Sequence, residues 1–140
     1  MSLSRSCTTA ALCVLILFAT KHSQARPVGM RFDIPFGFYV GDKALPAGSY
    51  VVELDMVSGI VALHNRTEFA QLGVSASPAL RDGNPGTLNG RLVFYTYGTA
   101  HVLKKVWMEG QLRGAFLQST RAEREMATAQ GKAMVEVASK

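Results

Sequence analysis

Residues 91–97, RLVFYTY, and residues 102–108, VLKKVWM, decide the fold of this 140-residue chain. Both runs are rich in the aromatic and β-branched residues that favour strands. Only four residues, beginning with Gly98, separate the two runs. Two such runs joined by a short link that contains glycine predict a β-hairpin.

Shorter alternating runs continue the β pattern on both sides of this hairpin. Residues 32–40 alternate apolar and polar side chains, and they predict one long strand or two strands broken at Pro35, because proline cannot donate to a ladder. Further strands, separated by turn residues, are predicted over residues 49–55, 60–64, 68–77 and 113–118. Regularly spaced short strands predict an all-β fold, either a mainly antiparallel sandwich or a small, partly open barrel.

The pattern changes near the C-terminus, where it predicts one α-helix. Thr120 and Glu123 match a capping box, in which the threonine hydroxyl accepts from a backbone amide and the glutamate reaches back. The next residues are good helix formers, and Gly131 is expected to end the helix. Residues 133–139 predict a closing strand, with continuation of the helix as the alternative. The helix carries a narrow apolar stripe for docking on a sheet, made of Ala122, Met126 and Ala129.

Residues 1–25 have the features of a secretory signal peptide. Arg5 supplies a positive start, residues 10–19 are an unbroken apolar run, and the segment ends in Ser-Gln-Ala at Ala25. A membrane span needs roughly 20 apolar residues, so we expect a cleaved leader rather than a transmembrane anchor. Cleavage at about Ala25 would leave residues 26–140 as a single β-rich domain outside the cytoplasm, in the periplasm or secreted.

The composition excludes several classes of function. Both cysteines, Cys7 and Cys13, lie in the predicted leader, so the exported domain is expected to lack disulfides, thiol nucleophiles and thiolate metal sites. The chain has a formal net charge of +5, but its basic residues are scattered, and Lys104 and Lys105 are the only adjacent pair. Nucleic-acid binding usually shows a concentrated basic stripe, so we expect no nucleic-acid partner.

No catalytic motif is readable in the chain. The two histidines after the leader, His64 and His101, lack zinc-binding spacing, and no nucleotide-binding motif or serine-hydrolase elbow is present. Glu53 and Asp55 share a strand face, which we interpret as a solvated strand edge rather than a glycosidase pair. We predict a non-enzymatic protein with no metal or cofactor. A hydrolase with a dispersed site around His64 or His101 is the alternative, because triads assemble across a fold.

The aromatic residues of the hairpin are the candidate ligand surface. If one hairpin face is exposed, Tyr95, Tyr97 and Trp107 could form a platform on which a ligand or glycan stacks. Lys104 or Lys105 would lie nearby. The alternative is that both faces are covered, as in a central strand of a two-layer fold. The aromatic residues would then belong to an ordinary core.

Several segments together point to a family. They are IPFGF at residues 34–38, VGDKALPAGSY at 40–50, LVFYTYG at 92–98, VW at 106–107 and STRAERE at 119–125. In these segments the chain resembles a family of small, functionally uncharacterised secreted bacterial proteins. The resemblance implies export and assigns no activity to any residue.

These observations predict a binding module rather than an enzyme. We expect a periplasmic or secreted protein that binds a partner at a surface or at the mouth of the barrel. The partner would be a protein, a glycan or an envelope component. A self-associating structural envelope protein, paired through sheet edges, is a further alternative to the hydrolase.

Overall fold

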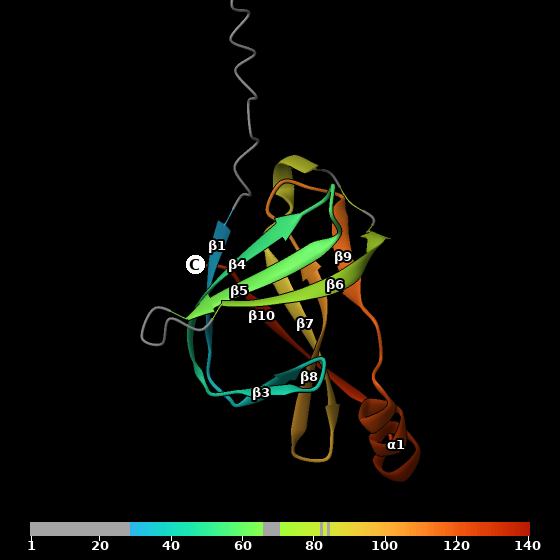
Figure 1. The fold of residues 1–140 in the computed structure, drawn as a ribbon. Helices are drawn as coiled ribbons and strands as arrows, with labels where there is room; N and C mark the ends of the chain where they lie inside the picture. The colour runs from blue at the N-terminus through green and yellow to red at the C-terminus, as the bar shows by residue number, and fades with distance from the viewer. Residues whose placement is uncertain (1–28, 66–70, 82, 84) are drawn as a thin grey trace, which may run out of the picture.

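The computed structural model describes residues 29–65, 71–81, 83 and 85–140, and the predicted leader lies outside them. The fold is all-β with one C-terminal helix, as predicted (Figure 1). No helix within the described ranges is long and apolar enough to cross a membrane. The elements are β1 (Gly29–Ile34), β2 (Phe38–Val40), β3 (Lys43–Leu45), β4 (Gly48–Asp55), β5 (Ile60–Asn65), β6 (Gln71–Leu80), the 3-10 helix η1 (Pro85–Thr87), β7 (Arg91–Tyr97), β8 (Ala100–Trp107), β9 (Arg113–Leu117), α1 (Arg121–Gln130) and β10 (Ala133–Ala138).

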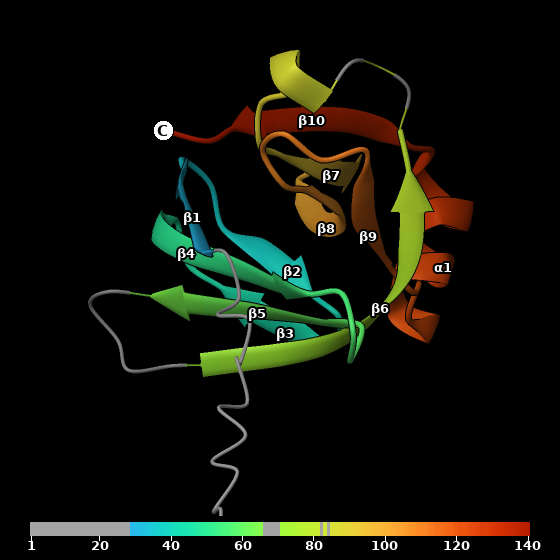
Figure 2. The same cartoon turned by 90° about the horizontal axis from the view of Figure 1, so that it is seen from above.

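The strands form one strongly bent sheet in the order β1-β4-β5-β6-β9-β8-β2-β3, and β7 and β10 extend it from β8. The strand β6 pairs with β5 through its first half and with β9 through its second half. It thereby joins two layers that face each other (Figure 2). The sheet does not close into a barrel. The strands β1 and β10 lie at two ends of the strand order, and the backbone N–H of Lys140, just after β10, donates to the carbonyl of Arg31 in β1 at 3.1 Å.

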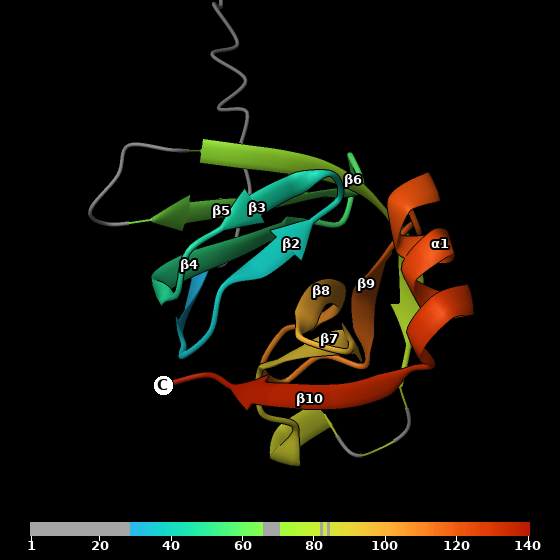
Figure 3. The same cartoon turned by 90° about the horizontal axis from the view of Figure 1, so that it is seen from below.

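Pro35 divides the first alternating run into two strands. β1 ends before it and pairs with β4, whereas β2 begins three residues later and pairs with β3 and β8. The chain therefore changes partners at the point where proline cannot donate a ladder hydrogen bond. Figure 3 shows β2 beside β3 after this change of direction.

The core fills the space between the two layers. Phe38 lies at its centre and is 1% exposed. Its ring makes edge-to-face contacts with Tyr50 at 5.3 Å and with Phe94 at 5.4 Å between centroids. The buried Tyr50 hydroxyl donates to the carbonyl of Pro46 at 2.7 Å. The aromatic residues of β2, β4 and β7 thus tie the layers together.

The predicted hairpin is formed by β7 and β8, and it contains a β-bulge. Val93 pairs with Lys105 and Phe94 pairs with Leu103, so Lys104 is the extra residue of β8. The bulge places Leu103 in the core and leaves Lys104 on the opposite face of the sheet. The strand β7 is central, since it pairs with β8 on one side and β10 on the other.

The helix α1 begins and ends where the sequence predicts, but it docks differently. The Thr120 hydroxyl accepts from the Glu123 N–H at 3.2 Å, and the chain turns at Gly131 with φ of 70°. The Glu123 carboxylate does not reach back to Thr120; it is buried against β7 and β8. The predicted apolar docking stripe is wrong, because Ala122 and Ala129 are exposed and Glu123 is the buried residue of the helix. The strand β10 confirms the closing strand over a continued helix.

Candidate functional site

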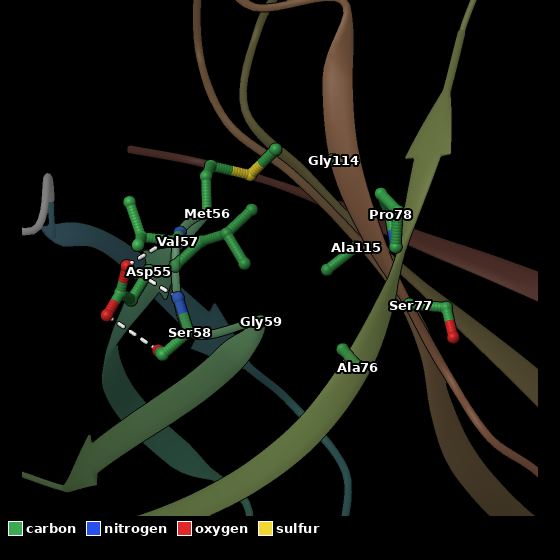
Figure 4. Close-up of a pocket in the computed structure, with 11 residues that line it drawn as sticks. Asp55, Met56, Val57, Ser58, Gly59, Ala76, Ser77, Pro78, Gly114 and Ala115 are labelled. Atoms are coloured by element: carbon green, nitrogen blue, oxygen red, sulfur yellow. Dashed lines mark hydrogen bonds between the residues drawn. The ribbon is translucent and has the colours of Figure 1, made fainter.

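A small pocket opens where the two layers separate at one end of the molecule. It has a volume of about 200 Å³. One wall is the turn between β4 and β5, and the other is the second half of β6 with the start of β9 (Figure 4). Its lining consists of Leu54, Asp55, Met56, Val57, Ser58, Gly59, Ala76, Ser77, Pro78, Gly114 and Ala115.

The turn that forms the first wall is held by Asp55. Its Oδ1 accepts from the backbone N–H of Val57 at 2.9 Å and of Ser58 at 3.3 Å, and its Oδ2 accepts from the Ser58 hydroxyl at 2.6 Å. These hydrogen bonds lower the pKa of the Asp55 carboxyl, with the Ser58 hydroxyl as the largest cause. Gly59 has φ of 67°, and a side chain there would press on the Ala76 carbonyl. These hydrogen bonds and the conformation of Gly59 define the turn that carries the exposed tip.

Exposed apolar side chains lie at the turn tip and, two residues beyond the pocket lining, at the end of β6. The turn tip carries Val57, which is 98% exposed, and Met56, which is 40% exposed. Leu80, at the end of β6, is 76% exposed and shares its strand face with Ala76 and Pro78. Apolar residues gathered at one place on a surface mark interaction sites more reliably than single ones.

A further strand cannot form a complete hydrogen-bonded ladder with β6, the second wall of the pocket, at Pro78. The N–H of Ala76 donates toward β5, to the Gly59 carbonyl at 2.7 Å, whereas the N–H of Arg81 donates toward β9, to the Leu112 carbonyl at 3.0 Å. Alternate residues of a strand present their N–H groups to opposite edges. Pro78 therefore sits where a donor would face the open edge, and proline has none. The pocket thus favours side-chain contacts over strand pairing.

The polar side chains that line the pocket are already hydrogen-bonded within the protein. Asp55 and Ser58 bond to each other across the turn. The Ser77 hydroxyl accepts from Gln118 Nε2 at 2.7 Å and points away from the turn (Figure 4). A ligand therefore meets a wall whose polar side chains are satisfied and whose surface is mostly apolar.

The three aromatic residues singled out in the sequence do not share an exposed surface. Tyr97 is 4% exposed and Trp107 is 7% exposed, while Tyr95 is half-buried. The Arg81 guanidinium lies 5.5 Å from the centre of the Trp107 ring, and the Lys132 amine lies 4.5 Å from that of Tyr95. A stacking platform would need all three rings to be accessible. Two of the three rings are buried and the third is partly covered, so in this structure they do not present one accessible platform.

A buried polar cluster, which the sequence does not predict, holds α1 against the hairpin. Lys104 Nζ donates to Glu123 Oε2 and to the Ser119 hydroxyl, both at 2.9 Å. The Tyr97 hydroxyl donates to Glu123 Oε1 at 3.1 Å. Burial, and secondarily the Glu123 carboxylate, raise the pKa of Tyr97 to about 12. The lysine pair Lys104-Lys105 within an apolar run was the available signal, but the partner of Lys104 lies 19 residues further along the chain.

The two histidines have different neighbours. His64 Nε2 lies 3.4 Å from Glu53 Oε2, an ion-pair distance without hydrogen-bond geometry. His101 Nδ1 lies 3.1 Å from the Thr96 hydroxyl, and its ring stacks on Phe36 with centroids 4.1 Å apart. In the ranges that the structure describes, no three His, Cys, Asp or Glu side chains are grouped so as to hold a metal ion.

Compared with protein-family models, curated proteins and solved structures, the chain matches none of them. The resemblance to a family of secreted bacterial proteins therefore stays a prediction. The candidate site rests on the geometry of the chain's own residues.

Proposed function

We propose that the chain is an exported, non-enzymatic binding module that receives its partner at the pocket between the β4–β5 turn and β6. One observation carries the proposal: an open, mostly apolar pocket lies beside a hydrogen-bonded turn whose tip residues, Met56 and Val57, are exposed. The predicted leader and the resemblance to secreted proteins support export. The partner is a protein, a glycan or an envelope component that presents an apolar group.

The energetics of the rim favour binding. Covering a fully exposed valine, leucine or methionine side chain contributes roughly 1.5–3 kcal/mol relative to leaving it in water. Val57 and Leu80 are exposed enough to supply most of that amount each. The hydrogen bonds of Asp55 hold the turn before any partner arrives, so little conformational entropy is lost on docking. A pre-organised apolar rim is what a binding site requires.

The test uses toluene as a compact apolar probe, with methyl groups followed by nuclear magnetic resonance. We expect saturable shifts of the methyl resonances of Leu54, Val57 and Ala115. The Ala76→Leu variant, which fills the pocket, should abolish them, provided that its melting temperature shows an intact fold. Met134→Ser is the matched control, because Met134 is 64% exposed on β10, away from the pocket lining.

Saturable shifts that disappear in Ala76→Leu and persist in Met134→Ser would support the site. Shifts scattered over other exposed methyl groups, or no saturable shifts at all, would refute it. Val57→Ser is a second variant that leaves the pocket floor unchanged. It should weaken the response without removing it, because it takes away only part of the rim.

A further inference from the structure

We infer that the ligand of this pocket is a monocarboxylate with an unbranched aliphatic chain, bound with its chain in the pocket and its carboxylate beside Arg113. The inference rests on the proposed function and names the ligand class for the same site. Three features of the structure carry it: the volume of the pocket, the line of apolar residues that leads out of it, and the position of one arginine.

The volume suits a hydrocarbon end rather than a whole polar ligand. The pocket holds about 200 Å³. A dry cavity of about 150 Å³ takes up benzene, whereas sites for drug-sized ligands span roughly 300–1,000 Å³. The polar side chains of the wall, Asp55, Ser58 and Ser77, have partners within the protein. A sugar or peptide group inside would lose its own hydrogen bonds to water, whereas a hydrocarbon would lose none.

The apolar surface has the form of a line rather than a bowl. Its floor is made by Leu54 and Ala115, which are 7% and 2% exposed. From there Ala76, Pro78 and Leu80 follow one another at every second position of β6. From Ala76 to Leu80 there are four steps along the strand, which extend about 13 Å. A flexible chain can stay in contact along this line, whereas a compact group fills the pocket and leaves Leu80 in water.

Arg113 lies at the outer end of the same line. It pairs with Leu80 in the ladder between β6 and β9, and directly paired residues of antiparallel strands place their side chains on the same face. Arg113 also precedes Ala115 by two positions in β9, so it shares the strand face that forms the pocket floor. The Arg113 side chain is exposed. A guanidinium at this place suits the carboxylate of a chain that enters past Leu80.

The test measures binding of a series of linear alkanoates, from butanoate to decanoate, below their micelle concentrations, by titration with methyl resonance detection. We expect the affinity to rise about fourfold for each methylene that enters the pocket, and to level off once the chain fills it. The Ala76→Leu variant should bring the plateau to a shorter chain. An affinity that does not change with chain length would overturn the inference.

The carboxylate contact is tested separately. Arg113→Gln should weaken octanoate binding by up to about fivefold, the range of an exposed ion pair, and should leave 1-octanol binding unchanged. Arg124→Gln is the matched control, because Arg124 is an exposed arginine on α1. An equal loss for octanol, or no loss for octanoate, would remove Arg113 from the site and overturn the carboxylate part.

Other probes separate this inference from the proposed function. If toluene and N-acetyl-leucinamide bind in the pocket and alkanoates do not, the ligand is a protein side chain and the binding module stands. If alkanoates fail while phosphatidylglycerol vesicles bind through Val57 and Leu80, the site is a membrane contact and the inference is overturned. If none of these probes shifts the pocket methyl groups, the proposed function fails as well.

Discussion

Replacing Lys104 with methionine should destabilise the fold far more than removing any exposed charge. The Lys104 and Glu123 side chains are 0% and 3% exposed, and their charged atoms lie 2.9 Å apart. Lys104 Nζ also bonds to Ser119 and lies 5.0 Å from the centre of the Phe116 ring. Methionine keeps the apolar volume of the lysine stem but removes the charge. The Glu123 carboxylate then remains buried without a counter-charge.

The magnitude follows from the environment of that carboxylate. Breaking a buried ion pair by removing one partner costs about 3–5 kcal/mol, because an uncompensated charge remains. The Tyr97 hydroxyl still donates to Glu123 in the variant, so the lower end of this range is expected. For a domain of this size, a loss of about 3 kcal/mol lowers the melting temperature by on the order of 12–20 °C.

Equilibrium unfolding in urea, followed by the fluorescence of the single tryptophan, Trp107, measures the effect. The matched control is Arg121→Met, which removes an ion pair to Glu125 of the same 2.9 Å length on the same helix, with side chains 88% and 67% exposed. That variant should lose no more than about 0.5 kcal/mol. The double variant Lys104→Met/Glu123→Leu should recover part of the stability, because no buried charge is left.

Two results would refute this reasoning. If Lys104→Met costs no more than Arg121→Met, the buried pair does not hold α1 against the hairpin. If the double variant loses at least the sum of the losses of the Lys104→Met and Glu123→Leu single variants, the cost does not come from an uncompensated charge.

Two further predictions concern the packing of Trp107 and the titration of Tyr97. Gly114→Ala should cost about 1–3 kcal/mol in urea unfolding, because the new methyl group would lie well inside 3.0 Å of the Trp107 ring and of a backbone oxygen. Gly37→Ala, which meets nothing closer than 3.6 Å, is its control, and equal stability of the two variants would contradict the packing. The Tyr97 phenolate, isolated as the absorbance difference from Tyr97→Phe, should form near pH 12. Because this pKa is raised on folding, the stability that Tyr97 contributes is complete below about pH 10 and is lost as the pH rises toward 12. Phenolate formation near pH 10 would show that the hydroxyl is not buried against Glu123.

Much of the secondary structure follows from local patterns. The β-favouring composition of β7 and β8, the break at Pro35 and the helix between Thr120 and Gly131 each depend on residues a few positions apart. Hydrophobic patterns and turn residues act within one element or at its ends, so the sequence alone is enough to predict such elements. The bulge at Lys104 is the exception within the hairpin. The bulge depends on which residues of β8 face the opposite layer and which face α1, and this is decided by the tertiary structure.

The candidate site could not be predicted from local sequence patterns. Two apolar residues at a turn, Met56 and Val57, were a readable signal in the sequence. The pocket beside them also needs Ala76, Pro78 and Ala115, which come from two other strands. Likewise, Glu123 matches a capping glutamate in the sequence and becomes the partner of Lys104 only in the folded chain.

The sequence by itself determined most of the strands and the position of the helix, because these properties arise between near neighbours; the short strand β3 and the bulge in β8 were not predicted. Only the tertiary structure decided the strand order, the passage of β6 between the layers, the burial of Lys104 with Glu123 and the pocket at the open end. The physical reason is that alternation assigns a side chain to one face of a strand and says nothing of the partner opposite. The partner is selected when distant segments bury their apolar faces together.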